Sequence, residues 1–239
     1  SGTISDASGN NATLAHGSVA NNSSYKVDTT APTTSWSAAT DDVGTVTGVL
    51  SSGDTTDDTA LVLSGTNEAG SSVMVYNGST QLGAATISGT NWSYSSTVDN
   101  GTTYQFNVTG TDPAGNTSAA TTNFAVTGDT TAPTLAISLS DYEMNPFKGD
   151  TAPYLSTITF NFSETPINFA TADITVQSGS IGSTLAVNGS DNTLYTATFT
   201  PTPGANDTTN KVTVGQAWTD TAGNAPAADS TSANYIVNL

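Results

Sequence analysis

The residues of this chain best suited to chemistry are acidic and recur in one short pattern. The pattern D-x-x-G-N occurs at Asp6–Asn10, Asp112–Asn116 and Asp220–Asn224, and a second string, D-T-T-A-P-T, begins at Asp28 and at Asp129. Carboxylate and amide oxygens are hard ligands, and Ca²⁺ binds about six to eight such oxygens in proteins. The pattern therefore predicts cation sites, and its candidate ligands are Asp6, Asn10, Asp28, Asp112, Asn116, Asp129, Asp220 and Asn224.

A second concentration of carboxylates flanks one short apolar segment. Asp41 and Asp42 precede residues 45–50, Asp57 and Asp58 follow them, and no Lys or Arg lies between. Carboxylates gathered at one end of a domain repel one another, and a divalent cation compensates for that repulsion. We therefore expect metal ligands at these four aspartates, and bound metal would contribute to folding.

The order of the two patterns suggests which residues meet. One short strand separates Asp112 and Asn116 from Asp129, and we expect that strand to return the chain to the same end of the domain. These three residues are therefore predicted to share one joint. Pro133 keeps the linker out of a helical conformation.

The second half of the chain should supply the other side of that joint. Glu164 and Asp173 are its candidate ligands, whereas Asp220 and Asn224 are assigned to the far end. Asp, Asn and Gly are also common in turns for conformational reasons alone. Plain turn chemistry is therefore the alternative interpretation for each aspartate taken singly.

Net charge restricts the possible partners. The 239 residues include 20 Asp+Glu but only 3 Lys+Arg, for a formal net charge of −17. Such a chain has no basic patch for nucleic acid and is repelled by anionic membranes. It has no Cys, which excludes disulfides and thiolate zinc sites. Membrane insertion is not expected, because no apolar run approaches about 18 residues.

Short alternating segments punctuated by turns predict an all-β fold. About seven strands per roughly 100 residues, with Asn-Gly turns between them, are typical of Ig-like β-sandwiches. We expect tandem Ig-like sandwiches arranged as an extended rod. The predicted strands are 45–50, 60–66, 72–76, 92–94, 103–110, 123–126, 134–139, 157–162, 174–176, 185–187, 194–199, 211–214 and 235–237.

The repeated strings divide the chain into three parts. Residues 1–27 end in a strand-like segment at 25–28 and are interpreted as the closing strands of an incomplete preceding repeat. Residues 28–128 form one Ig-like unit, and residues 129–239 form a second unit with different internal motifs.

Several longer motifs resemble a known family. They are T-D-D-V-G-T-V-T-G (40–48), T-D-D-T-A-L-V-L-S-G-T (56–66), T-D-P-A-G-N (111–116), A-D-I-T-V (172–176) and W-T-D-T-A-G-N (218–224). Together they resemble the bacterial Ig-like repeats of giant, calcium-dependent surface adhesins of the RTX type, which are exported by type I secretion. The resemblance implies a stalk in which Ca²⁺ rigidifies the joints between domains.

The resemblance also implies a location and partners. The chain is expected to be extracellular, at the bacterial cell surface, with neighbouring Ig-like repeats of the same chain as its partners. Other domains of the whole protein would bind a host, surface or glycan ligand in cell adhesion or biofilm formation. No enzyme activity is expected: His16 has no catalytic context, and Glu68 and Glu164 fall in different units.

Two other functions remain open. A carbohydrate-binding module would use Trp36, Trp92 and Trp218 as stacking surfaces, although a place in or near the sandwich core suits these residues better. A self-assembling extracellular filament or surface-layer subunit would use residues 1–27 to complete a sandwich in a neighbouring molecule.

Overall fold

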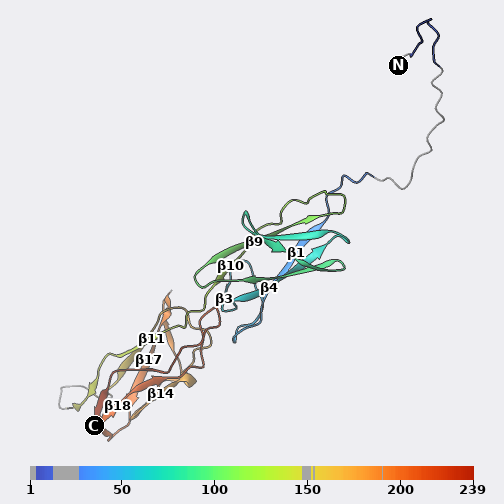
Figure 1. Cartoon of the computed structure of the whole chain (residues 1–239). Helices are drawn as coiled ribbons and strands as arrows, with labels where there is room; N and C mark the ends of the chain where they lie inside the picture. The colour runs from blue at the N-terminus through green and yellow to red at the C-terminus, as the bar shows by residue number, and fades with distance from the viewer. Residues whose placement is uncertain (1–3, 13–26, 147–151, 153, 190) are drawn as a thin grey trace.

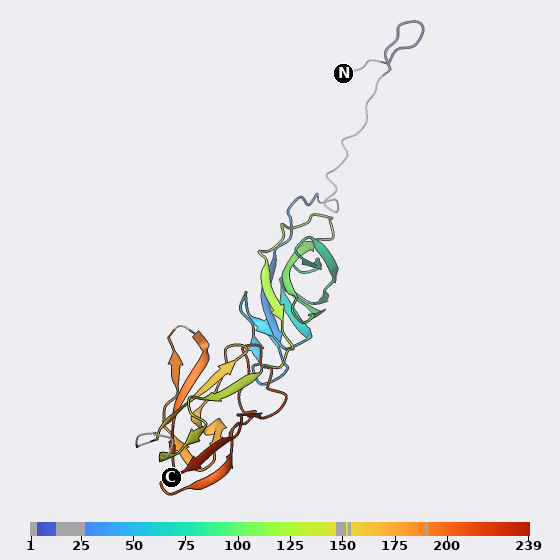
Figure 2. The ribbon, with the colours of Figure 1, turned by 90° about the vertical axis from the view of Figure 1, so that its left-hand side faces the viewer.

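The chain folds into two all-β units that lie end to end. The structure, a computed structural model, describes residues 4–12, 27–146, 152, 154–189 and 191–239. The first unit runs from β1 to β10 and the second from β11 to β21 (Figures 1 and 2). The predicted all-β tandem arrangement is confirmed. Within the described part of the chain, no helix is long and apolar enough to cross a membrane.

Two five-stranded sheets form the first unit. One has the order β2-β1-β4-β8-β7, and the other has the order β3-β10-β9-β5-β6. The described strand pairs of this unit are antiparallel, except that β3 and β10 run parallel. The strands are β1 (Thr34–Asp41), β2 (Gly48–Val49), β3 (Thr55–Thr56), β4 (Ala60–Asn67), β5 (Ser72–Asn77), β6 (Thr80–Ala84), β7 (Thr86–Ser88), β8 (Asn91–Thr97), β9 (Thr103–Thr111) and β10 (Phe124–Gly128).

Alternating side chains fill the core of the first unit. In β4, Leu61 and Leu63 are fully buried, whereas Val62 between them is 43% exposed. The facing sheet contributes Val75 from β5 and Phe106 from β9 to the same cluster. A period of two residues is what a strand with one buried face requires, and each large apolar side chain buried in this way contributes about 2 kcal/mol.

One five-stranded sheet and two three-stranded sheets form the second unit. Their orders are β11-β13-β17-β15, with β16 also paired to β17, then β12-β21-β18 and β14-β19-β20. The elements are β11 (Leu135–Leu139), β12 (Glu143–Met144), β13 (Ser156–Phe162), the 3-10 turn η2 (Thr171–Asp173), β14 (Ile174–Val176), β15 (Gly179–Ile181), β16 (Ala186–Asn188), β17 (Asp191–Pro201), β18 (Asn206–Asn210), β19 (Val212–Val214), β20 (Ser230–Thr231) and β21 (Tyr235–Asn238).

Aromatic side chains dominate the second core, and the tryptophans belong to the two cores. Trp218 is 1% exposed, and its ring lies edge-on to Phe162 at a centroid distance of 4.8 Å. In the first unit Trp92 is also 1% exposed, and the Trp36 ring lies 5.1 Å from that of Phe124. These three rings therefore do not form the sugar-stacking surface that a carbohydrate-binding module would need.

The clearest difference from the predicted strands is β1. Its sequence, T-S-W-S-A-A-T-D, is mostly small and polar, and its pairing with β4 shifts register between Trp36 and Ala38. Such a bulge adds one residue to one strand. It interrupts the alternation by which a strand is recognised, so the sequence did not predict this one.

Most of the predictions for residues 1–27 lie outside the described residues. This applies to His16 and to the start of the expected strand at 25–28. Val27 and Asp28 are described and are not in a strand. Within residues 4–12, Ser5 and Asn11 form a single β-bridge around the first D-x-x-G-N pattern. Strand donation by residues 1–27 therefore stays a prediction.

Candidate metal centre at the joint between the units

The last D-x-x-G-N pattern folds into a loop organised by its own aspartate. Asp220 Oδ1 accepts hydrogen bonds from the backbone N–H groups of Ala222 (2.9 Å), Gly223 (2.8 Å) and Asn224 (2.9 Å). Asn224 Nδ2 donates to Asp220 Oδ2 at 2.9 Å. Gly223 has a φ of 108°, which L-residues with a side chain rarely adopt. The Asp, the Gly and the Asn of the pattern are thus each needed by the loop.

The other two copies of the pattern fold in the same way. Asn116 donates to Asp112 through its backbone N–H and its Nδ2, both at 2.8 Å, and Asn10 donates to Asp6 through the same two groups at 2.9 Å. Hydrogen bonds from the partner Asn side chain, more than any other cause, hold the pKa of Asp112 and of Asp6 below the usual value. These hydrogen bonds within each loop support the interpretation of Asp112 and Asp6 as turn residues.

The loops at Asp112–Asn116 and Asp220–Asn224 also bind a linker. Asn224 Nδ2 donates to the carbonyl oxygen of Asp129 at 2.9 Å, and Asn116 Nδ2 donates to that of Asp28 at 3.1 Å. In both linkers the Asp Oδ1 accepts the N–H of the residue two positions later at 3.0 Å. The D-x-x-G-N loop therefore fastens the linker that precedes its own unit.

This arrangement corrects two predictions about position. Asp112 and Asn116 do not share a joint with Asp129, and Asp220 and Asn224 lie at the joint rather than at the far end. The cause is the direction of the last strand: β10 is antiparallel to β9, and Thr127 pairs with Thr103. A single strand crosses the domain once, so it carries the chain away from the loop at Asp112 to the opposite end.

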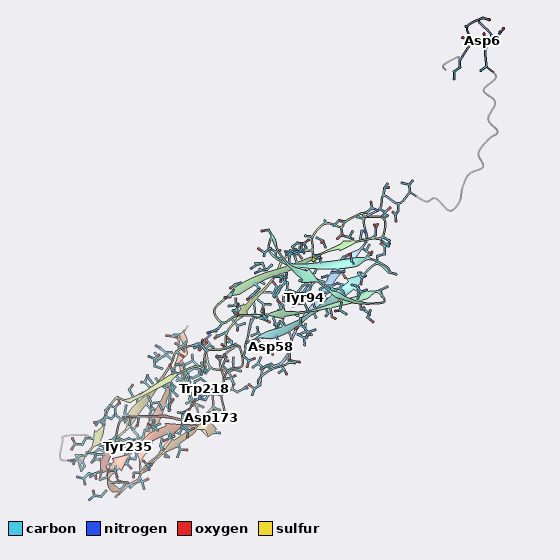
Figure 3. The ribbon with its side chains drawn as sticks, viewed as in Figure 1. Asp6, Asp58, Tyr94, Asp173, Trp218 and Tyr235 are labelled. Carbon is cyan, nitrogen blue, oxygen red and sulfur yellow. The ribbon has the colours of Figure 1, made fainter. Side chains whose placement is uncertain are left out.

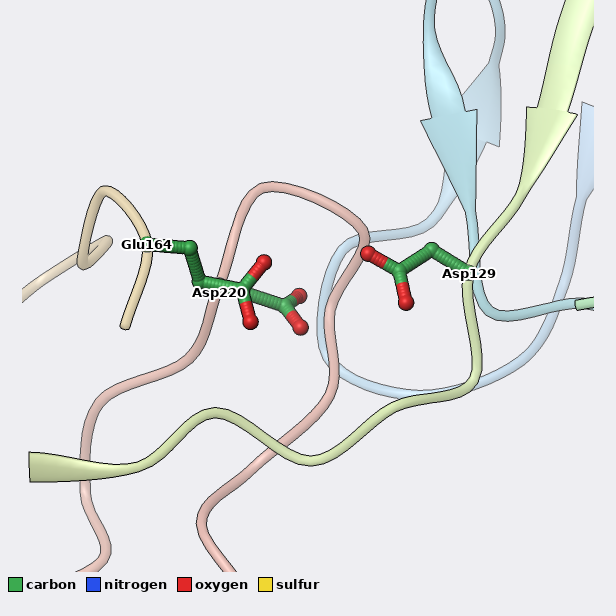
Figure 4. Close-up of side chains that lie close together, drawn as sticks. All are labelled: Asp129, Glu164 and Asp220. Atoms are coloured by element: carbon green, nitrogen blue, oxygen red, sulfur yellow. The ribbon is translucent and has the colours of Figure 1, made fainter. Parts of the chain in front are cut away.

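Three carboxylates meet at the joint. Carboxylate oxygens of Asp129, Glu164 and Asp220 lie within 4.8 Å of one another (Figure 4). Asp220 is fully buried, and Asp129 and Glu164 are half-buried. Glu164 was predicted to reach this joint, and the structure places it there. No other group of three such residues gathers in this way among the described residues.

A short bridge between two loops of the second unit brings Glu164 and Asp220 together. Ile167, just after Glu164, donates its N–H to the carbonyl of Thr219 at 2.7 Å, and Thr219 donates back at 3.1 Å. The neighbouring Trp218 is held in the core, and its Nε1 donates to the carbonyl of Gly215 at 3.1 Å. The core therefore fixes the position of Asp220.

Burial and like charge act together on Glu164. Its pKa is raised, first by burial and then by the negative charges of Asp220 and Asp129. The chain has only three basic residues, Lys26, Lys148 and Lys211. Of these, Lys211 is the one that lies among the described residues. It directly precedes β19, and its backbone N–H donates to Gln177 Oε1.

The end of the first unit brings further carboxylates to the same joint. Asp41 and Asp58 are 2% and 3% exposed. Asp41 Oδ2 accepts the Thr56 hydroxyl at 2.6 Å, and Asp58 Oδ1 accepts the N–H of Ala60 at 2.7 Å. The other carboxylate oxygen of Asp58 is buried without a hydrogen-bond partner.

Asp57 links the two units. An added Cβ on Gly44 would overlap with Asp57 Oδ2, and one on Gly223, in the second unit, would lie 3.2 Å from the same atom. Two glycines thus make room for this carboxylate. Its pKa is raised by burial first, then by Asp41, with Asp220 and Asp58 adding to the shift.

The remaining predicted ligands lie elsewhere. Asp42 is exposed. Asp173 Oδ2 accepts the N–H of Ala170 at 2.8 Å and so caps η2, and Asp173 is not one of the three gathered carboxylates. The expectation that Asp173 reaches the joint is wrong, because its side chain is used within its own loop.

One contributor to the joint was missed. Asn100 Oδ1 accepts the N–H of Thr130 at 2.9 Å, and its Nδ2 donates to Thr131 Oγ1 at 3.0 Å. Its Asn-Gly dipeptide predicted the turn between β8 and β9, where Gly101 has a φ of 71°. Nothing in that dipeptide indicates that the side chain also holds the linker.

Two family models match the two units of the chain. Residues 28–130 match one family model described as a bacterial Ig-like domain, and residues 129–237 match a second model with the same description. A solved structure of fibronectin(III)-like modules of Clostridium thermocellum CbhA aligns with a TM-score of 0.36 and 11% identity, covering 79% of this chain and 91% of that one. No curated protein gives a significant match.

Proposed function

Since the chain contains two bacterial Ig-like domains in tandem, we propose that it is a segment of an extracellular stalk whose joint is stiffened by Ca²⁺. The stalk would hold a ligand-binding domain of the same protein away from a bacterial surface, in adhesion or biofilm formation. Export by type I secretion, as in the RTX-type adhesins, is part of this proposal. The domains themselves act as structural modules.

The observation that carries the proposal is the group formed by Asp129, Glu164 and Asp220, whose carboxylate oxygens lie within 4.8 Å of one another. Two unit charges at that separation repel by about 3 kcal/mol in a medium of effective dielectric constant about 20. A divalent cation turns this repulsion into attraction. The donors fit Ca²⁺, which prefers hard oxygens.

These residues come from three separate segments of the chain. Asp129 lies in the linker, and Glu164 and Asp220 lie in separate loops of the second domain. Asp57 of the first domain is close enough to Asp220 for the charge of Asp220 to raise its pKa. A bound ion supplies positive charge where both domains present negative charge. Asp129, Glu164 and Asp220 would hold it, and the linker would be fixed on the second domain.

Calcium titration of the intact chain tests the proposal. We expect Ca²⁺ to bind in calorimetry, raise the melting temperature and narrow the distribution of interdomain distances in solution scattering. Glu164→Gln should weaken binding at least tenfold. Glu68→Gln is the matched control, because Glu68 follows β4 as Glu164 follows β13 but is exposed. If Ca²⁺ leaves the wild-type melting temperature and scattering unchanged, the proposal is wrong.

A further inference from the structure

One aromatic side chain of the first domain takes no part in its core. Tyr94, labelled in Figure 3, packs against the core cluster with its ring next to Gly83 of β6. Tyr76 near the end of β5 is different, because its neighbour Val75 points into the core and Tyr76 therefore lies on the outer face of the sheet. The other aromatic residues between positions 28 and 128 all belong to the core cluster or pack against it, and they are Trp36, Trp92, Tyr94, Tyr104, Phe106 and Phe124.

Tyr76 borders a small pocket on this outer face. Tyr76 and Asn107 are paired directly across β5 and β9, and Thr109 lies two residues further along β9 on the same face. The pocket has a volume of about 180 Å³ and is lined by Tyr76, Gly78, Ser79, Asn107, Thr109 and Ala120. Since pockets for drug-sized ligands measure about 300–1,000 Å³, this one suits a single small ring.

Asn107 supplies the pocket with a hydrogen-bond acceptor. The residue is only 4% exposed, and its Nδ2 donates to Gly78 O at 2.9 Å and to Asn123 Oδ1 at 3.0 Å. Both amide hydrogens are therefore used, which fixes the orientation of the side chain. Among the described residues no group donates to Asn107 Oδ1, and an amide oxygen can accept two hydrogen bonds. A hydroxyl group of a ligand in the pocket would supply a donor to this oxygen.

The segment that carries Ala120 is held along β9, on the side away from β5. Thr121 N donates to Val108 O at 3.0 Å, and Thr121 Oγ1 accepts the N–H of Val108 at 3.1 Å. Ser118 N donates to Gly110 O at 2.9 Å. Ala120 lies between these two anchored residues, so its position beside the pocket is fixed. The pocket is thus formed by the domain itself, and a ligand would not have to order it.

The chemistry of the lining selects the class of ligand. All six lining residues are uncharged, and the net charge of −17 repels anions. The pocket offers an aromatic ring, an amide oxygen and the hydroxyls of Ser79 and Thr109. A neutral pyranose sugar has an apolar C–H face that can lie on an aromatic ring and hydroxyls around its rim, so it matches each of these groups.

We propose that the first domain binds one neutral pyranose ring in this pocket, with the C–H face on Tyr76 and a hydroxyl donating to Asn107 Oδ1. The inference goes beyond the proposed function and does not depend on a cation, because every lining residue lies within the first domain. One ring makes few contacts, so we expect a dissociation constant of about 1–10 mM. Where several such domains follow one another on a stalk, weak sites of this kind would act together on a sugar-coated surface.

Titration of the ¹⁵N-labelled intact chain with simple sugars tests the site. The probes are the methyl glycosides of glucose, galactose, mannose and N-acetylglucosamine, each added in EDTA to ten times the expected dissociation constant. We expect at least one of them to shift the amide signals of residues 76–79, 107–109 and 120 along a saturable curve. Methyl glucuronide, which is negatively charged, should bind at least tenfold more weakly than methyl glucoside if glucoside is that ligand. The proposal is overturned if none of the four neutral glycosides gives saturable shifts at these residues.

Two leucine variants locate the binding. Ala120→Leu places a larger side chain at the pocket and should weaken binding at least tenfold. Ala119→Leu is the matched control, because Ala119 is the neighbouring exposed residue and does not line the pocket, and its affinity should equal that of the wild type. Equal affinities in the two variants would show that the sugar binds elsewhere and would overturn the site.

Variants of Tyr76 test the stacking. Tyr76→Phe keeps the ring and should retain most of the affinity, whereas Tyr76→Ala should lose at least tenfold. Wild-type affinity in Tyr76→Ala would contradict the proposal. Melting temperatures show whether each variant is folded, and if Tyr76→Ala does not fold, the two leucine variants decide. Because all titrations are made in EDTA, they give the same answer whether or not Ca²⁺ binds at the joint.

Discussion

The two ends of the first domain have the same loop and linker chemistry. At one end Asn116 binds the carbonyl of Asp28, and at the other Asn224 binds that of Asp129. The surroundings differ. Asp28 is exposed, whereas Asp129 is half-buried and lies with Glu164 and the fully buried Asp220.

The difference separates what a domain builds alone from what its neighbour adds. The D-x-x-G-N loop forms from its own hydrogen bonds, as in residues 6–10. Burial around Asp220 depends on the preceding domain, since Gly223 lies against Asp57 and Val46. Contact with a neighbouring domain thus converts an ordinary loop into a buried site where several carboxylates lie close together.

The largest effect should come from removing the loop aspartate at the two ends. Asp220→Ala leaves the N–H groups of the buried Ala222 and Gly223 without acceptors, and we expect it to destabilise the second domain by about 3 kcal/mol. Asp112→Ala should cost less, because the corresponding Ala114 and Gly115 are exposed and water replaces the carboxylate. Urea unfolding in EDTA measures both, and equal losses would contradict the comparison.

A smaller effect should separate the two loop glycines. Gly223→Ala and Gly115→Ala both place a side chain at positive φ, at 108° and 94°, which costs about 1 kcal/mol each. Only at Gly223 does the new Cβ meet the other domain, 3.2 Å from Asp57 Oδ2, while Gly115 has nothing within 4 Å. Gly223→Ala alone should increase interdomain motion in ¹⁵N relaxation. The same motion in both variants would show that the contact does not restrain the joint.

The smallest effect should be the response to pH without metal. The raised pKa of Glu164 means that its stabilising contribution is complete below its unfolded-state pKa and is lost as pH rises through the folded value. The lowered pKa of Asp112 has the opposite sign, so its contribution is lost as pH falls through the lowered value. In EDTA, acidification from about pH 7 to about pH 5 should raise the wild-type melting temperature relative to that of Glu164→Gln. Parallel pH profiles would contradict this assignment.

Much of the fold could be predicted because most strands alternate clearly. The segments 60–66 and 157–162 correspond closely to β4 and β13. β1 was not predicted, because its small residues and its bulge interrupt the two-residue alternation of apolar and polar side chains. The short edge strands β6, β7 and β15 also lack a strong apolar signal, since packing against one neighbour suffices to hold them.

The site could be predicted by residue type but only partly by position. Asp129, Glu164 and Asp220 are all candidates from the sequence, yet the sequence places Asp220 at the wrong end, because the single strand after each loop is expected to return the chain to the same end but carries it to the opposite one. Asp57 between two glycines depends on the contact of two domains. Residue spacing within one domain carries no record of such a contact.

Asp129 gives the joint a fixed geometry. Its N–H binds Thr56 of the first domain, and its carbonyl accepts Asn224 of the second. Both domains are thus held by the backbone N–H and carbonyl of a single residue, which leaves little room for variation in the angle between the domains. Asp28 lies 101 residues earlier with the same carbonyl contact. Units joined in this way would repeat one rise and one rotation, and a long series of them would be a helical shaft with a constant pitch.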